Sequence, residues 1–510
     1  MARSQKARAY PASISAPTGG WNARDSLPMM AANDAVQLTN WFPGTTDVFL
    51  RKGFTNFATG FPGQVETLMN YAGGADEELF GISTGNIYDI TAGGAVPAAS
   101  VSGLANSRFQ YANITTAGGS FMLCVNGADK LQGYDGSAWW VDGDGTHDIT
   151  GVDTADISNI TLFKNRIWMV EQNTLNAWYL GVDAISGAAT KFPLRSVAQL
   201  GGNLVAVATW TLDAGYGVDD YIVFITSHGE IIVYRMTDPS TASTLSLIGV
   251  WHLGQPVGQR CLMKYGGDLI VICQDGLVPL AKALQSSRLN PRVALSDKIQ
   301  FAVSTAISTY GANFGWDMCY YPKENMLILN VPVDTGSQEQ YVMNTISGSW
   351  CNFTGWDANC WVIFNEEPYF GGNQVVGRAW NGLADNDSNI EGIGKQAFSS
   401  FKSPGVQKRW TMMRPVLLTN GSPTILANIN VDFNLNTSTA PLNFTPTAYA
   451  VWDTGVWDTS VWGGDLNVLN NWQGVYGVGV YAAPVLQTSS QGIDVHWVST
   501  DLVMERGGIL

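Results

Sequence analysis

The residues best suited to metal or acid–base chemistry are scattered through this sequence. The four histidines are far apart in the chain, so they form no zinc-binding motif. They are His147, His228, His252 and His496. The segment DGDGTHD at residues 142–148 comes nearest to a metal site, because carboxylate oxygens are the ligands that calcium prefers. This segment lacks the rest of a twelve-residue calcium loop, and DNDSNIE at residues 385–391 lacks a glycine at the sixth loop position. Acidic turns are common, so we predict no metal site.

Motifs that carry catalysis or bind cofactors are missing from the sequence. It contains no HExxH zinc-protease motif, no Gly-x-Ser-x-Gly nucleophile turn, no P-loop and no dinucleotide-binding fingerprint. We therefore predict that the protein is not an enzyme and binds no cofactor.

Acidic side chains are concentrated in the middle of the chain. The net charge of the 510 residues is −15. Residues 61–395 hold 32 of the 42 acidic side chains and 16 of the 27 basic ones. A surface of this kind repels a nucleic-acid backbone, because phosphate binding needs clustered Lys and Arg. Solubility alone is the simpler explanation for the acidity.

The compartment is suggested by the cysteines and by the apolar runs. Six cysteines lie in or beside apolar segments without a CxxC pair, which favours buried thiols in a reducing environment. The N-terminus has no apolar signal core, and no apolar run approaches 18 residues. We expect no signal peptide and no stable membrane insertion.

A strand–turn–strand unit recurs from about residue 60 to residue 395. The turn residues Gly85, Gly127, Asn173, Gly229 and Gly276 mark five of these units. Gly, Asn and Asp suit tight hairpin turns, and the flanking Ile, Val, Leu, Tyr and Trp suit strands buried on both faces. A unit of about 40–60 residues with four short strands is typical of propeller blades. The sequence therefore predicts an all-β protein with a β-propeller of about six to seven blades over residues 56–395.

One helix interrupts this pattern at residues 296–308. Ile299, Ala302, Val303 and Ala306 have helical spacing, and Ser296 is placed to cap the helix. The helix is expected either to face a neighbouring subunit or to fill a crevice of its own domain.

The two ends of the chain differ from the propeller. Residues 1–55 are rich in Pro and Gly and predict an extended arm, with one short helical turn over residues 33–40. Such an arm buries little of itself and either stays mobile or lies on a partner. Residues 396–510 predict a β-rich C-terminal domain. In that domain Trp452, Trp457 and Trp462 lie five residues apart, which favours either local packing or an exposed aromatic contact edge.

The segment APTGGWNARDSLPMMAANDAVQLTNWFPGTTDVFLRKGF at residues 16–54 resembles the opening of a family of short-tailed bacteriophage tail proteins. The family comprises nozzle, tail tubular and packaged-DNA-stabilisation proteins. The phrases GNIYDIT and YDGSAW, the SDKI helix start and the ending WVSTDLVMERGG are also similar to it. The resemblance thus touches nearly the whole chain, although each piece is short.

This resemblance implies a structural role in the virion tail. It implies a homo-hexameric ring below the head–tail adaptor protein that closes the DNA ejection channel and then conducts the genomic DNA, without sequence-specific binding. Tail fibre, spike or tip proteins are further expected partners, and assembly is expected in the host cytoplasm. On this basis Trp21, Arg24, Trp41 and Phe42 are predicted to contact another subunit or the adaptor.

Two other functions stay open at this stage. One is a receptor- or glycan-binding propeller at the tail surface, which needs exposed aromatic residues over a pocket. The other is a glycosidase, which needs two carboxylates that face each other across a central cleft. Acidic residues are plentiful, but the sequence does not show which of them converge.

Overall fold

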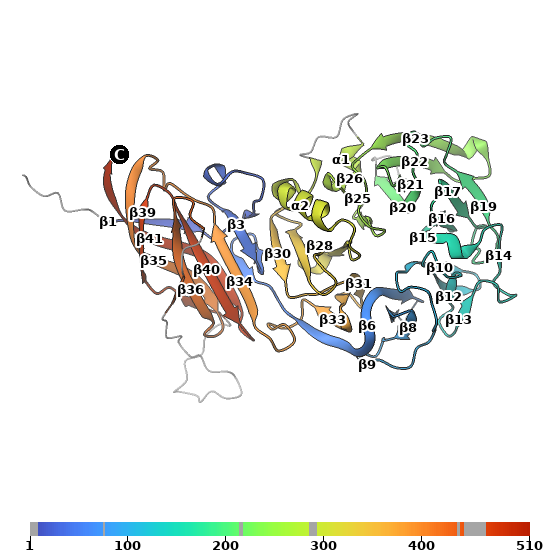
Figure 1. Cartoon of the computed structure of the whole chain (residues 1–510), viewed down its shortest axis with the longest axis horizontal. Helices are drawn as coiled ribbons and strands as arrows, with labels where there is room; N and C mark the ends of the chain where they lie inside the picture. Colours follow the sequence, from blue (N-terminus) through green and yellow to red (C-terminus); the bar gives the residue numbers. More distant parts are fainter. Residues whose placement is uncertain are drawn as a thin grey trace, which may run out of the picture.

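The computed structural model describes residues 9–74, 77–213, 218–284, 293–435, 439–442 and 466–509. Two β-rich parts lie side by side, a ring of small sheets and a sandwich of two larger sheets (Figure 1). Within the described residues, no helix has both the length and the apolar character that crossing a membrane requires.

The ring is a β-propeller, with seven blades in the described part of the chain. Each blade is an antiparallel sheet of three or four short strands. The first blade contains β6 (Phe54–Ala72), β7 (Glu77–Ser83) and β8 (Asn86–Asp89), and the second contains β10 (Gln110–Thr116), β11 (Gly119–Val125), β12 (Gln132–Tyr134) and β13 (Trp139–Val141). The third contains β15 (Ile157–Phe163), β16 (Arg166–Glu171), β17 (Asn176–Tyr179) and β19 (Thr190–Pro193), the fourth contains β20 (Leu204–Asp213), β21 (Val218–Thr226), β22 (Glu230–Met236) and β23 (Leu245–His252), and the fifth contains β24 (Leu262–Tyr265), β25 (Asp268–Cys273) and β26 (Gly276–Pro279). The sixth contains β27 (Asp317–Tyr321), β28 (Met326–Pro332), β29 (Gln338–Asn344) and β30 (Trp350–Thr354), and the seventh contains β31 (Cys360–Phe364), β32 (Glu367–Gly371) and β33 (Asn373–Ala379) with β6. The predicted all-β propeller is confirmed.

The long strand β6 closes the ring, because it belongs to two blades. Residues 54–64 pair with β33 in the last blade, and residues 65–72 pair with β7 in the first blade. The first strands of successive blades then lie next to one another around the centre of the ring. These inner strands are β6, β10, β15, β20, β24, β27 and β31. Closure hides the apolar faces that a single blade would expose to water.

The sandwich combines strands from both ends of the chain. Its first sheet contains β1 (Ala9–Ser15), β4 (Trp41–Pro43), β5 (Val48–Leu50), β35 (Val406–Thr419), β38 (Asn467–Leu469), β39 (Gln473–Gly479) and β41 (Val495–Ile509). Its second sheet contains β2 (Gly20–Trp21), β3 (Asp34–Thr39), β34 (Ile390–Gln396), β36 (Thr424–Val431), β37 (Ala440–Pro441) and β40 (Ala482–Ser490). Trp41, Trp410 and Trp497 are fully buried between the two sheets.

The N-terminal residues therefore differ from the expected arm. Residues 34–39, predicted as a helical turn, form the strand β3. Ala35 and Leu38 are fully buried there, so tertiary packing and sheet pairing with β34 override the weak local helix signal. The described N-terminal residues also do not form a free arm, because β1 pairs along its length with β41 of the same chain.

One sheet continues from the propeller into the sandwich. Thr39 of β3 pairs in parallel with Asn352 of β30, and the backbone N–H of Asn40 donates to the carbonyl of Asn352 at 2.8 Å. The sixth blade and the second sandwich sheet thus form one sheet of ten strands.

The predicted helix is present as a single 3-10 turn, Asp297–Ile299, followed by α2 (Gln300–Tyr310). Val303, Ala306 and Ile307 are buried against the propeller, whereas Phe301 is 61% exposed. Ser296 occupies the N-cap position of the 3-10 turn as predicted, but its hydroxyl accepts a hydrogen bond from the backbone N–H of Leu277 instead of one from the helix. The buried face of the helix fills a crevice of its own domain.

The ion pair between His496 and the carboxylates of Asp47 and Asp494 makes the sandwich sensitive to pH. Burial opposes protonation of His496, but hydrogen bonds to Asp47 at 2.6 Å and to Asp494 outweigh it and raise its pKa to about 9. Since the folded state holds this proton more tightly than the unfolded state, its contribution is complete below pH 6.5 and is lost as the pH rises through 9. We expect the free energy of unfolding to fall by about 1–3 kcal/mol across that window. Thermal unfolding of His496→Gln should have a flatter pH dependence, and an unchanged slope would contradict the prediction.

Candidate functional site

Two of the predicted contact residues are core residues in this structure. Trp41 is 0% exposed and Phe42 is 3% exposed, and both lie in the largest apolar cluster of the sandwich. Their side chains present no surface to another subunit or to an adaptor in this conformation. This part of the prediction is wrong: β4 places both rings in the apolar core of the sandwich, where Phe42 packs edge-on against Trp380 with ring centroids 5.6 Å apart.

The other two predicted contact residues lie nearer the surface. Trp21 is half-buried and packs edge-to-face on Tyr341 with ring centroids 5.2 Å apart. Arg24 binds the carboxylate of Asp25 at 2.9 Å and that of Asp297, which fastens the N-terminal loop to the start of the α2 segment. The hydrogen bond from Arg24 lowers the pKa of Asp25 to about 2. A contact of Trp21 or Arg24 with a partner stays a prediction.

The buried side chain of Arg51 connects the N-terminal segment, the propeller and residue 385. Its side chain is fully buried, and it donates to both carboxylate oxygens of Asp385 at 2.7 and 2.6 Å. It also donates to Asn40 Oδ1 at 2.9 Å and to the carbonyl of Thr354 at 2.6 Å. Asp385 was one of the weak candidates for a metal ligand, and its carboxylate is instead engaged by this guanidinium.

The centre of the propeller holds a second arginine that ties several blades together. Arg260 donates to Thr67 Oγ1 at 2.7 Å and to the carbonyls of Glu66 and Phe109 at 3.1 and 3.3 Å. Its guanidinium also lies 3.7 Å from Asp317 Oδ2. Burial raises the pKa of Asp317 to about 6, although the positive charge of Arg260 opposes the rise.

A central cavity of about 260 Å³ adjoins this pair. Asp317 is the single carboxylate among its described lining residues, which are otherwise neutral apart from Arg260. A glycosidase needs a second carboxylate roughly 5–9 Å across the cleft. The described lining of this one cavity contains no second carboxylate.

The segment 142–148, the other metal candidate, is held by its own hydrogen bonds. The carboxylate of Asp142 accepts from the backbone N–H of Ile149 at 2.7 Å and from the Thr154 hydroxyl at 2.5 Å. Asp144 accepts from the backbone N–H of His147 at 2.7 Å, so it stabilises the turn. No group of three metal-binding side chains converges anywhere in the described residues.

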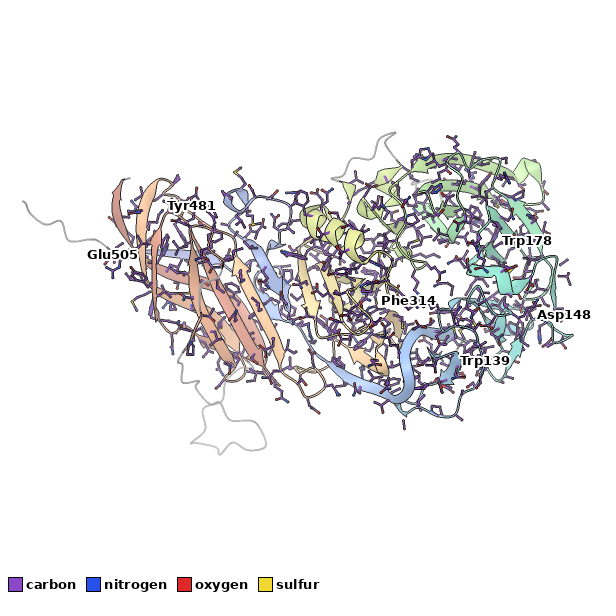
Figure 2. All side chains as sticks on the ribbon, viewed as in Figure 1. Trp139, Asp148, Trp178, Phe314, Tyr481 and Glu505 are labelled. Atoms are coloured by element: carbon purple, nitrogen blue, oxygen red, sulfur yellow. The ribbon has the colours of Figure 1, made fainter. Side chains whose placement is uncertain are left out.

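The far end of the propeller carries an acidic surface. Residues 129–156 contain seven aspartates and one basic side chain, Lys130. The exposed acids of this rim, continuing to residue 183, are Asp135, Asp144, Asp148, Asp153, Asp156 and Asp183. Lys130 is already paired with Asp153 at 2.9 Å. Figure 2 shows Asp148 at the end of the molecule opposite the sandwich residues Tyr481 and Glu505.

The first sandwich sheet carries an apolar patch on its outer side. On β35, β38 and β39 and the link between the last two, several large apolar side chains are exposed. They are Met412, Val468, Trp472, Tyr476 and Val478, with Tyr476 the most exposed at 76%. Contiguous apolar patches of this kind often mark protein–protein contacts. The alternating sequence of β39 was a usable signal for this patch, but the sequence did not show which side of the sheet the described residues leave exposed. The predicted aromatic edge at Trp452, Trp457 and Trp462 lies outside the described residues.

Comparison with known proteins finds only distant structural similarities. The chain matches no protein-family profile and no curated protein sequence. Among solved structures it is similar to the BBS1N protein crystallised with ARL6DN, at 10% identity and a TM-score of 0.41 over 66% of this chain and 99% of that one. It is also similar to the Swd1 β-propeller domain of Myceliophteria thermophila, at 12% identity and a TM-score of 0.39 over 64% and 98%. YCF48 from Cyanidioschyzon merolae is similar at 9% identity and a TM-score of 0.27 over 66% and 97%. The propeller assignment itself comes from the seven sheets described above.

Proposed function

We propose that this protein is a structural component of a bacteriophage tail nozzle, where it forms a ring that closes and then conducts the DNA ejection channel. The observation that carries the proposal is the uneven charge of the propeller. The rim of residues 129–156 is acidic, and its one basic side chain is neutralised by a neighbouring aspartate. A wall of this charge repels phosphate, so DNA passes without being retained.

The sequence resemblance at residues 16–54 supports the same role, since it extends from Gly19–Gly20 through the buried segment Trp41–Pro43 to Arg51. The apolar patch around Tyr476 gives the sandwich a surface suited to contact between subunits. Closed rings of identical chains use such surfaces in head-to-tail interfaces. The proposed partners are further copies of this chain, the head–tail adaptor and the more distal tail proteins.

Imaging of virions tests the proposal directly. We expect six copies of this chain in one ring on the tail axis, with the acidic rim of the propeller turned toward the lumen. Single, peripheral copies would exclude a nozzle and would instead favour the receptor- or glycan-binding alternative.

A charge-reversal variant tests the role of the rim. In Asp135→Lys with Asp144→Lys, Asp148→Lys and Asp156→Lys, four exposed acidic side chains become basic. We expect rings to assemble normally but DNA release to slow at low salt and to recover at high salt, because screening weakens attraction to phosphate. Release measured by dye entry should be unaffected in the matched variant with four Asp→Asn changes. Normal release by the lysine variant at low salt would contradict a lumen-facing rim.

A further inference from the structure

A groove of about 680 Å³ lies where the propeller meets the sandwich. Its floor is the ten-stranded sheet that runs from β28, β29 and β30 through β3 to β34, and α2 forms one wall. Figure 1 shows α2 beside this junction. The volume is within the range of binding pockets for small ligands and peptide side chains. Since α2 is not part of any blade, this wall is an addition to the repeating unit of the propeller.

Aromatic side chains give the groove an apolar lining. Trp21 and Tyr341 meet edge-to-face on one side, and Phe301 and Tyr310 come from α2. Phe301 is 61% exposed although its ring borders the groove. An exposed aromatic ring next to a concave surface offers a large contact area at a low cost in side-chain entropy.

The same groove contains two charges of opposite sign that do not neutralise each other. Glu339 of β29 and Lys395 of β34 both line it. Neither side chain has a hydrogen bond or ion pair with any described residue, whereas the nearby charges are paired, Lys298 with Asp34 and Arg24 with Asp25 and Asp297. Burial raises the pKa of Glu339 because part of its hydration is lost without a compensating partner. Partly buried charges without partners are unfavourable, so a ligand that pairs with them gains binding energy.

We propose that this groove binds an extended protein segment in which a basic side chain and an acidic side chain flank an aromatic or aliphatic anchor. The basic group pairs with Glu339, the acidic group pairs with Lys395, and the anchor packs between Phe301, Tyr341 and Trp21. Charge complementarity favours a peptide over a neutral glycan, because sugar hydroxyls can hydrogen-bond to Glu339 and Lys395 but cannot supply the opposite charges. The site goes beyond the proposed ring and does not depend on it.

Selection from a random peptide library against the immobilised full chain tests this site. We expect the selected peptides to combine Lys or Arg, an apolar residue and Asp or Glu, with the two charges in one constant order along the peptide. The variant Glu339→Lys with Lys395→Glu should lose about tenfold or more in affinity for them, because each pair becomes a like-charge contact. Peptides with their two charges exchanged should bind this variant better than the wild type.

The matched control is Glu366→Lys with Lys402→Glu, which exchanges two exposed charges outside the groove and keeps the net charge. This control variant should bind the selected peptides as the wild type does. Phe301→Ala should lower the affinity for the selected peptides without altering the charge preference. Equal binding to the groove variant, no common charge pattern among the peptides, or affinity for a neutral glycan array instead would overturn the proposal. These results are obtained on the isolated protein, so they are separate from the imaging that tests the ring.

Discussion

Replacing Arg51 with methionine should lower the free energy of unfolding by about 3–5 kcal/mol, because a buried charge then loses its partner. Asp385 is only 12% exposed and would keep its carboxylate without the two short hydrogen bonds from Arg51. The carbonyl of Thr354 and the Asn40 side chain lose donors as well. The guanidinium also packs 4.7 Å from the ring centre of Trp356, a favourable contact that methionine only partly replaces. Denaturant unfolding of the full chain measures the loss.

The neighbouring Lys52 supplies the matched control. Lys52 is 43% exposed and its amine lies 3.5 Å from Glu324, so Lys52→Met should change stability by less than about 1 kcal/mol. The double variant Arg51→Met with Asp385→Asn should recover part of the loss, since no unpaired charge remains. If Arg51→Met lowers the free energy of unfolding no more than Lys52→Met does, the contacts of Arg51 do not stabilise the junction.

Arg51 also illustrates a type of contact that cannot be predicted from the sequence. Residues 51–53 belong to the opening that resembles the tail proteins, but nothing in their local pattern marks Arg51 as buried. Besides the carbonyl of Lys52, the hydrogen-bond partners of Arg51 are residues 40, 354 and 385, and the last two are 303 and 334 positions away. Pairing over such separations depends on ring closure by β6, which no local pattern encodes.

The propeller could be predicted because each of its hairpins is specified by residues that are close together in the sequence. Each hairpin needs only a turn residue and two flanking apolar runs, so Gly85, Gly127 and Gly229 mark blades without any knowledge of their neighbours. The N-terminal segment was not predictable in the same way. Its short strands, such as β4 and β5, lie in a sheet with strands from the opposite end of the chain, so their burial becomes visible only in the folded sandwich.

The two proposed functional surfaces also differ in how far the sequence predicts them. The acidic rim at residues 129–156 could be read from the sequence, because its charges are neighbours in the chain. The pair Glu339 and Lys395 could not, because β3 and β30 must first join the two parts of the molecule. Arg260 and Asp317 were missed for the same reason, although each lies close to the start of an inner strand.

Replacing Arg260 with methionine should destabilise the propeller most at high pH. Asp317 already has a pKa of about 6, above its ordinary value of 3.8, because burial disfavours its charged form. A raised pKa in the folded state means that stability is highest below 3.8 and falls as the pH rises through 6. Without the positive charge of Arg260, the pKa of Asp317 rises further, so the loss of stability continues to higher pH. For each further rise of the folded-state pKa by one, the loss grows by about 1.4 kcal/mol at a pH above both the folded and the unfolded pKa.

Unfolding free energies at about pH 5 and about pH 8 separate this effect from the lost hydrogen bonds. The hydrogen bonds to Thr67 and to the carbonyl groups of Glu66 and Phe109 are lost at both pH values, whereas the penalty from Asp317 grows toward the higher pH. Adding Asp317→Asn to Arg260→Met should abolish the pH-dependent part. Arg108→Met is the control, because Arg108 lies over the same Phe314 ring but is 49% exposed and pairs with Glu66 instead. An equal loss at both pH values in Arg260→Met would show that Asp317 does not depend on Arg260, and the centre of the propeller would then be held by hydrogen bonds alone.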